Sequence, residues 1–337
     1  MHISRRTVAA LAVAVGTMGW GSLAQAEVDK VTIAVGGKSL FYYLPLTIAE
    51  QRGYFKEEGV NVTIVDFAGG SKALQAVVGG SADVVSGAYE HTINLQSKKQ
   101  YFKAFVQQAR APQIVLAVST KTMPNYQSLA DLKGKKIGVT APGSSTNMVA
   151  SFVLDKAGIN SKDVSFIGVG AGSGAVAAMK SGQIDAISNL DPVISSLERD
   201  GAIKVLVDTR KMSGARDVFG GDMPAGCLYT SEAFIQNNPK TVQALTNAMV
   251  KAARWIQTAS PEDVLKTVPS SYSMGDPDLY KKTFLSLKEA MSPDGVISPE
   301  GVKTALKSLA AYKPQIKADE IDLARTYTNE FVMRAPK

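Results

Sequence analysis

Two glycine- and hydroxyl-rich turns carry residue types that bind small anions. Residues 69–71 read Gly-Gly-Ser and residues 142–147 read Pro-Gly-Ser-Ser-Thr-Asn, and each turn lies between an apolar run and a helix-like segment. Glycine lets the backbone approach a ligand closely, hydroxyl groups cap the next helix, and free N–H groups at a helix N-terminus favour a negative charge. Two such turns facing each other across a cleft would suit a carboxylate, sulfonate or phosphate. The alternative for both turns is that they only cap their own helices.

Residue types that catalysis and metal binding require are scarce. Cys227 is the only cysteine, which excludes an intramolecular disulfide, and beyond the N-terminal segment His91 is the only histidine. Residues 36–39 end like a phosphate-binding loop but lack the glycine that this loop needs farther upstream. Residues 170–175 match a dinucleotide-binding fingerprint, but they lie in the second strand-helix unit of their half, whereas this fingerprint belongs in the first. We therefore expect no catalytic residue, no metal and no cofactor.

The elements that would position the two turns form an internal repeat. Residues 62–87 align without gaps with residues 164–189, at an offset of 102. Each copy has the pattern of a strand, a Gly-Ser turn, a short apolar helix and a second apolar strand. The gapless match predicts two lobes of the same construction. Identical pairs in the two copies include Gly70 with Gly172, Ser71 with Ser173, and Asp83 with Asp185.

The repeat predicts an α/β protein. In each half a first strand, a loop and a helix precede the repeated segment, and this order requires a mixed, mainly parallel sheet flanked by helices. From residue 231 onward the pattern is helical and offers no sheet of its own, so we expect this tail to pack on the first lobe. Lobe one is expected to comprise residues 27–120 and 222–337, and lobe two residues 121–221.

The N-terminus has the pattern of an export signal. Two arginines precede an apolar run that is too short to cross a bilayer, and a small-x-small pattern predicts cleavage after Ala26. Adjacent arginines fit either the Sec or the twin-arginine export route. Removal of Arg5 and Arg6 lowers the formal net charge from +7 to +5, and the remaining lysines and arginines are scattered. We therefore expect no nucleic-acid partner.

Ligands of open α/β sheets bind beyond the carboxyl ends of the strands, which directs attention to six loops. In the first half these are residues 36–43, 68–71 and 86–91, and in the second half residues 141–147, 170–173 and 188–192. Tyr42, Tyr43 and Tyr89 lie in such loops and offer rings that stack on an apolar ligand body. Packing of these rings in the protein interior is the alternative for each of them.

Several segments resemble a known family. The chain is similar to the periplasmic substrate-binding proteins of sulfonate, taurine and nitrate importers, a group that is also similar to the thiamine-precursor-synthesis fold family. The segments that carry this resemblance are residues 41–46, 49–60, 79–84, 131–135 and 182–186.

The resemblance implies a two-lobe fold of the second periplasmic-binding type, a small-molecule ligand in the cleft between the lobes, and delivery by a soluble periplasmic monomer to an ABC permease in the inner membrane. Two alternatives remain, a protein that binds or synthesises a thiamine precursor (a pyrimidine) and a ligand-sensing module of a membrane receptor. A small organic anion, either a sulfonate or a carboxylate and in some cases an aromatic one, is the expected ligand. Carrying the family's pocket over by position gives Ser39, Tyr42, Tyr43, Gly70, Ser71, Ser86, Tyr89, Ser144, Ser145, Thr146, Asn189 and Asp191.

Overall fold

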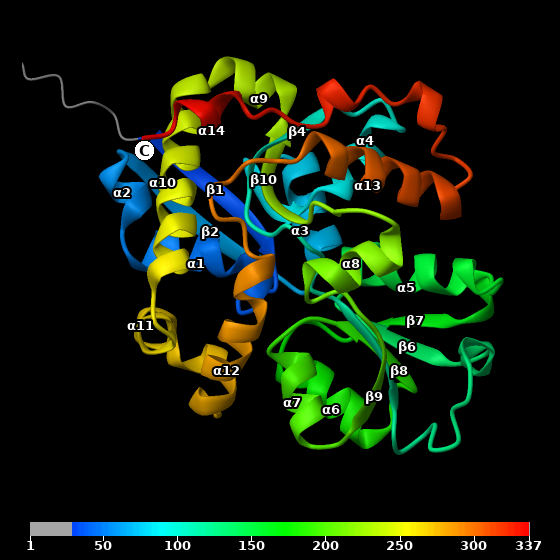
Figure 1. Cartoon of the computed structure of the whole chain (residues 1–337). Coiled ribbons are helices and arrows are strands. Elements are labelled where there is room, and N and C mark those ends of the chain that lie inside the picture. Colours follow the sequence, from blue (N-terminus) through cyan, green and yellow to red (C-terminus); the bar gives the residue numbers. More distant parts are fainter. Residues whose placement is uncertain (1–28, 337) are drawn as a thin grey trace, which may run out of the picture.

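Two five-stranded sheets form the centres of two lobes (Figure 1). The computed structural model describes residues 29–336, so the predicted export signal lies outside the described residues. The first sheet has the strand order β2-β1-β3-β10-β4 and the second the order β7-β6-β8-β5-β9. The strands are β1 (Asp29–Gly36), β2 (Val60–Phe67), β3 (Val84–Ala88), β4 (Phe102–Gln107), β5 (Val115–Ser119), β6 (Lys136–Val139), β7 (Ser165–Gly168), β8 (Ala186–Asn189), β9 (Ile203–Asp208) and β10 (Gly226–Ser231).

The two sheets have the same construction, which confirms the predicted fold class. In each sheet three strands run parallel, a fourth strand (β10 or β5) joins them antiparallel, and the edge strand (β4 or β9) pairs antiparallel with that fourth strand. A hydrogen-bonding pattern also repeats, because Asp83 accepts a bond from the Thr32 amide at 2.7 Å and Asp185 accepts one from the Lys136 amide at 3.0 Å. This aspartate occurs in both copies of the repeat. It precedes β3 in the first lobe and β8 in the second, and in each lobe it binds the backbone of the neighbouring strand, β1 or β6.

The chain passes between the sheets twice, and the first passage lies earlier than predicted. β5 was expected at the end of the first lobe, but it pairs antiparallel with β8 and β9 and belongs to the second sheet. The second sheet therefore begins at Val115 and not after residue 120. Its side chains alternate between the two faces of the second sheet, since Val115 and Ala117 enter one apolar cluster of the second lobe while Leu116 and Val118 enter another.

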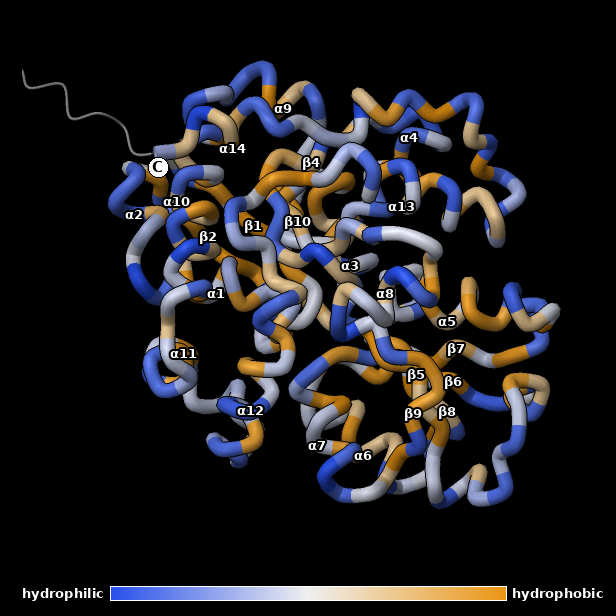
Figure 2. The backbone as a smooth tube through the Cα atoms, viewed as in Figure 1, coloured by the Kyte–Doolittle hydropathy of each residue, from blue (hydrophilic) through white to orange (hydrophobic). Residues whose placement is uncertain are grey.

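Helices cover both faces of each sheet (Figure 1), and hydrophilic and hydrophobic residues alternate along these helices (Figure 2). Around the first sheet lie α1 (Leu44–Gln51), α2 (Tyr54–Glu57), α3 (Gly70–Val78) and α4 (Glu90–Gln96). Around the second sheet lie α5 (Ser145–Lys156), α6 (Ser173–Ser181), α7 (Val193–Arg199) and α8 (Met212–Phe219). None of the helices found within residues 29–336 is long and apolar enough to cross a membrane.

The C-terminal helices pack on the first lobe and also contact the second. Proline stands in the first turn of α10 to α13, and Ser260, Asp276 and Ser298 accept backbone N–H bonds at the starts of three of these helices. α13 packs on both α4 and α5, and α12 contacts α7. The tail thus touches both lobes. Its helices are α9 (Glu232–Asn237), α10 (Pro239–Thr258), α11 (Pro261–Thr267), α12 (Pro277–Leu287), α13 (Pro299–Tyr312) and α14 (Glu330–Arg334).

Candidate functional site

The N-termini of α3 and α5 meet where the two lobes face each other. The Ser71 amide donates to the Ser144 hydroxyl at 3.0 Å, and the hydroxyl groups of these two serines are 3.1 Å apart. The Ser71 hydroxyl also donates to the Pro142 carbonyl at 2.9 Å. Neither helix has a side-chain N-cap bond among the described contacts. The positive ends of two helix dipoles therefore point into one small region.

Glycine is required at this contact because the backbones approach closely. A Cβ atom on Gly69 would lie 2.8 Å from the Ala141 side chain and 3.0 Å from the Ser144 hydroxyl. Any side chain at Gly69 would therefore hold the second lobe away from the first.

His91 connects the same region to the interior of the first lobe. Its Nδ1 lies 2.9 Å from the Tyr229 hydroxyl, and its ring also hydrogen-bonds the backbone of Gly143 in the second lobe. Burial lowers the pKa of His91 to about 4, so the ring is neutral at physiological pH. Tyr43 completes this wall, because its hydroxyl would lie 3.8 Å from a Cβ atom on Gly70.

Glu90, the residue before His91, is a buried acid in the same wall. Its side chain is 3% exposed, and burial raises the pKa of its carboxyl to about 7, although the Lys313 ammonium acts in the opposite direction. Burial also lowers the pKa of Lys313. The Glu90 charge is felt by Tyr42, Tyr43 and Tyr229, which are all buried.

The structure places the predicted residues in three groups. Tyr43, Gly70, Ser71 and Ser144 come together at the contact between the lobes, and half-buried Ser145 follows Ser144 in the first turn of α5. Tyr42 is buried beside them, with its ring edge-on to Tyr43 at 4.9 Å.

The side chains of the second group hold loops in place. The Thr146 hydroxyl accepts a bond from the Thr140 amide at 3.1 Å, and the Ser86 hydroxyl accepts one from Gln108 at 2.9 Å. Asn189 bonds the Gly170 carbonyl, and Asp191 accepts from the Ser195 amide and lies 3.7 Å from Arg210.

Tyr89 and Ser39 make up the third group. The Tyr89 hydroxyl lies 2.6 Å from that of Thr326, so it points to the C-terminal segment and not to the cleft, contrary to the prediction. Ser39 is half-buried in the turn after β1.

Sequence reasoning missed Glu90, Tyr229, Tyr312 and Lys313. Glu90 lay inside one of the six expected loops, but a single acid there gave no signal. Tyr229 lies on β10, and Tyr312 and Lys313 lie at the end of α13, so their proximity to Glu90 depends on tertiary structure.

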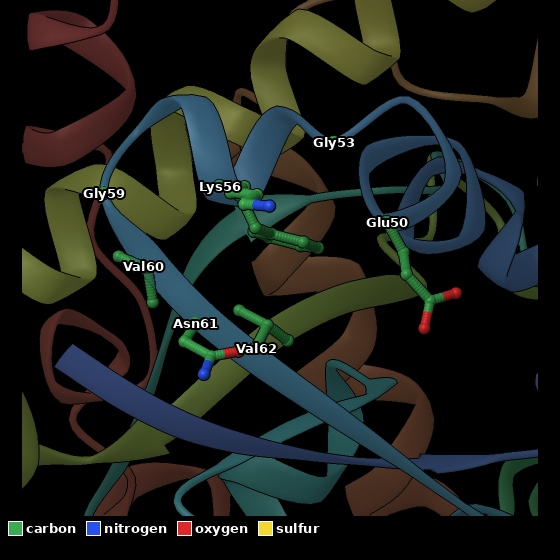
Figure 3. Close-up of a pocket in the computed structure, with 8 residues that line it drawn as sticks. Glu50, Gly53, Lys56, Gly59, Val60, Asn61 and Val62 are labelled. Carbon is green, nitrogen blue, oxygen red and sulfur yellow. The ribbon is translucent and has the colours of Figure 1, made fainter. Parts of the chain in front are cut away.

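Hollows also lie outside this contact. A groove of about 580 Å³ runs between the lobes beside α5 and is lined in part by Asn147, Tyr312 and Lys313. A hollow of about 700 Å³ on the first lobe lies between α2 and β2 and includes Glu50, Lys56 and Asn61 (Figure 3). The second hollow contains none of the predicted site residues. Within residues 29–336, no cluster of acidic, histidine or cysteine side chains could hold a metal ion.

Comparison with known proteins identifies relatives along most of the chain. A model described as the NMT1-like family matches residues 24–268. A protein of Bordetella bronchiseptica RB50 with a solved structure is 60% identical, with a TM-score of 0.90, and the match covers 90% of this chain and 96% of that chain. YtlA of Bacillus subtilis, whose name says only that it is a binding protein, is 25% identical over 80% of this chain and 79% of its own length.

Two more distant matches are a solved structure with the same fold and a relative found by sequence. The alkanesulfonate-binding protein SsuA from Xanthomonas axonopodis pv. citri, solved with bound MOPS, is 20% identical with a TM-score of 0.69, and the match covers 90% of this chain and 99% of that chain. The 4-amino-5-hydroxymethyl-2-methylpyrimidine phosphate synthase of Aspergillus parasiticus is 21% identical over 90% of this chain and 87% of the enzyme.

Proposed function

The chain belongs to the NMT1-like family, and we propose that it is the extracytoplasmic solute-binding component of an ABC importer that captures a small organic anion between its lobes. The anion is a sulfonate or a carboxylate, and the tyrosines of the site suit an aromatic one. The protein acts as a periplasmic monomer after cleavage behind Ala26, and it delivers its ligand to a permease in the inner membrane.

The observation that carries this proposal is the meeting of two helix N-termini from opposite lobes. With the lobes closed, the Ser71 and Ser144 hydroxyls satisfy each other at 3.1 Å. An oxyanion placed between them would accept bonds from both hydroxyls and from first-turn N–H groups of α3 and α5, where the helix dipoles favour negative charge. A ligand would then hold the two lobes together.

We assign direct ligand contact to Tyr42, Tyr43, Gly70, Ser71, Ser144 and Ser145. The bonds of Ser86, Thr146, Asn189 and Asp191 assign these residues to the support of the binding loops. The name of SsuA as an alkanesulfonate-binding protein supports an anion for this fold.

Alanine variants of the two serines test the proposal. Loss of a hydrogen bond to a charged group costs about 1.5–3 kcal/mol, so Ser71→Ala and Ser144→Ala should each weaken anion binding by about ten-fold or more. The ligand is first identified by a thermal-shift screen over sulfonates, carboxylates and nitrate, and its affinity is then measured by titration calorimetry.

Ser173→Ala is the matched control. Ser173 occupies the position of Ser71 in the second repeat copy, opens α6 and is exposed. Its variant should bind within about two-fold of the unmodified protein. Equal affinity in all three variants would place the anion elsewhere.

The likeness to pyrimidine phosphate synthases makes an enzyme the second candidate. Such an enzyme forms 4-amino-5-hydroxymethyl-2-methylpyrimidine phosphate, so the purified chain is incubated with a deproteinised cell extract and this compound is sought by mass spectrometry. A binding protein forms none of it, and its appearance only when the chain is present would favour the enzyme.

A further inference from the structure

We propose that Gln113 lowers the ligand affinity of the protein without touching the ligand, because this residue is in an unfavourable state when the lobes are closed. Gln113 thereby favours the open lobes and the release of ligand. The inference deepens the proposed function, and its ligand measurement rests on that function. Its cross-linking measurement needs no ligand.

Gln113 lies in the short segment that carries the chain from the first sheet to the second. β4 and β5 are joined by residues 108–114. The Gln108 amide donates to the Gly226 carbonyl of the first sheet at 2.6 Å, and the Gln113 amide donates to the Thr209 carbonyl next to the second sheet at 3.0 Å. Both ends of the segment are therefore fixed to their lobes. A rotation between the lobes has to change the few backbone angles between these ends.

The backbone of Gln113 has a left-handed conformation, with φ at 57°. Residues other than glycine adopt this conformation at a cost, because their Cβ atom comes too close to the following carbonyl oxygen. Pro112 precedes Gln113, and its ring fixes its own φ. Among the residues the structure describes, the other non-glycine residues with a positive φ are Lys99 and Met274, and neither lies in a passage between the lobes. The cost at Gln113 thus falls on the hinge.

Buried polar atoms without partners gather in the same segment. Within the described part of the chain, both amide atoms of the Gln113 side chain, Oε1 of Gln108 and Nε of Arg110 have no hydrogen-bond partner. Gln113 is 1% exposed. A buried polar group without a partner is destabilising, because it has lost its hydrogen bonds to water. This cost belongs to the closed form, since separation of the lobes lets water reach their junction.

Two unfavourable features of one residue thus oppose closure. A ligand that binds only the closed form has to offset them, and its apparent dissociation constant is the intrinsic constant divided by the closed fraction of the free protein. Removal of these features should therefore raise the closed fraction and tighten ligand binding by the same factor.

Cross-linking of the lobes measures the closed fraction without ligand. The reporter protein carries Ser71→Cys/Ser144→Cys, because the two serine hydroxyl oxygens are 3.1 Å apart in the closed structure, and oxidised glutathione forms the disulfide. Gln113→Gly removes both the backbone cost and the unpaired amide, so it should raise the rate of cross-linking about three- to ten-fold. Gln113→Leu removes the amide alone and should raise the rate by a smaller factor.

Lys99→Gly is the matched control. Lys99 has φ at 62° in an exposed turn after α4, so glycine relieves the same backbone cost away from the hinge. This variant should cross-link within about two-fold of the reporter protein. Equal acceleration in Lys99→Gly and Gln113→Gly would be a general effect of glycine, and it would overturn the inference.

Titration calorimetry adds the ligand measurement. It uses proteins that keep Ser71 and Ser144, together with the ligand that the thermal-shift screen identifies. Gln113→Gly should bind this ligand more tightly, by the factor found in cross-linking. Weaker binding with an unchanged rate of cross-linking would mean that Gln113 touches the ligand, contrary to the inference.

The outcomes separate this inference from the proposed function. An unchanged or slower cross-linking rate in Gln113→Gly would overturn the inference and leave the anion site standing. Faster cross-linking, with no anion bound in the screen, would support the effect of Gln113 on closure and count against the proposed function. If Gln113→Gly does not fold, Gln113→Leu decides, and a rate no faster than that of the reporter protein would reject the inference.

Discussion

The His91 ring joins the two lobes, because it has a hydrogen-bond partner in each of them. One side of the ring meets the Tyr229 hydroxyl at 2.9 Å, and the ring also bonds the Gly143 backbone across the cleft. Burial lowers its pKa from 6.5 to about 4. An unfolded chain therefore binds a proton at this residue well before the closed protein does, and acid favours the unfolded state.

His91→Gln should make stability less sensitive to acid. The neutral ring contributes its full stability above pH 6.5, and this contribution is lost as the pH falls toward about 4. Between about pH 7.5 and about pH 4.5 the free energy of unfolding of the unmodified protein should fall by about 2.5 kcal/mol more than that of the variant. Urea unfolding at both pH values measures the difference.

Glu90 titrates in the opposite direction, and the comparison removes its effect. Its raised pKa of about 7 adds relative stability as the pH falls from 7 toward 4.5. This contribution is common to both proteins, so it cancels in the difference between them. Parallel pH profiles for the two proteins would show that His91 is not held neutral by burial.

At the level of residues, the sequence predicts the turns better than the side-chain directions. Gly70, Ser71 and Ser144 were expected in a cleft because glycine and serine follow strand ends, and this local rule does not depend on the rest of the fold. Tyr89 obeys the same rule but turns to Thr326, which is 237 residues away. Periodicity carries no information about a partner so distant in the chain.

Among the elements, α5 has the largest part in holding the second half of the site. Its first turn follows Ser144, and farther along the helix Phe152 is 6% exposed. The Phe152 ring lies 5.1 Å from Phe219 of α8 and 6.3 Å from Tyr312 of α13. α5 therefore packs on the C-terminal tail as well as on its own lobe.

Phe152→Ala should destabilise the protein by about 3–4 kcal/mol, because it removes a buried ring and leaves a cavity between three helices. Ligand binding should also weaken, since the N-terminus of α5 loses its support. Urea unfolding followed by circular dichroism measures the loss. Leu285→Ala on α12, where the side chain is 57% exposed, should change stability by no more than about 0.5 kcal/mol. A loss below about 1 kcal/mol for Phe152→Ala would contradict the packing described here.

The sequence predicts a helix or strand well where a single local rule determines where it begins. Proline in the first turn marks the start of α10 at Pro239 and of α13 at Pro299. The prediction placed β5 in the wrong lobe because an apolar strand has the same sequence pattern in either sheet. Its pairing with β8 and β9 depends on the tertiary structure.

For the whole molecule, the structure shows the lobes closed on each other. Besides the serine contact, the Phe41 amide donates to the Asp191 carbonyl at 3.2 Å, and Arg199 pairs with Asp276 of the tail at 2.6 Å. The ion pair is exposed and adds little stability. Closure between two lobes is a hinge motion that a ligand can stabilise by contacting both sides.

A disulfide between positions 71 and 144 should therefore shut the cleft against ligand. The two serine hydroxyl oxygens are 3.1 Å apart, and small side-chain rotations would bring cysteine sulfurs to the bonding distance of about 2.05 Å. Ser71→Cys/Ser144→Cys should oxidise readily without ligand, and a bound anion should slow the reaction because it occupies the space between the helix ends. Cys227 is 1% exposed and should not compete for the bond.

The oxidised double variant should lose ligand binding, and reduction should restore it. Titration calorimetry before and after reduction measures this, while thiol labelling under non-reducing conditions reports the extent of the cross-link. The single variant Ser71→Cys controls for the substitution, because its affinity should not respond to reductant. Full cross-linking with unchanged affinity would mean that ligand does not pass between the N-termini of α3 and α5, and it would remove the closed cleft as the binding state.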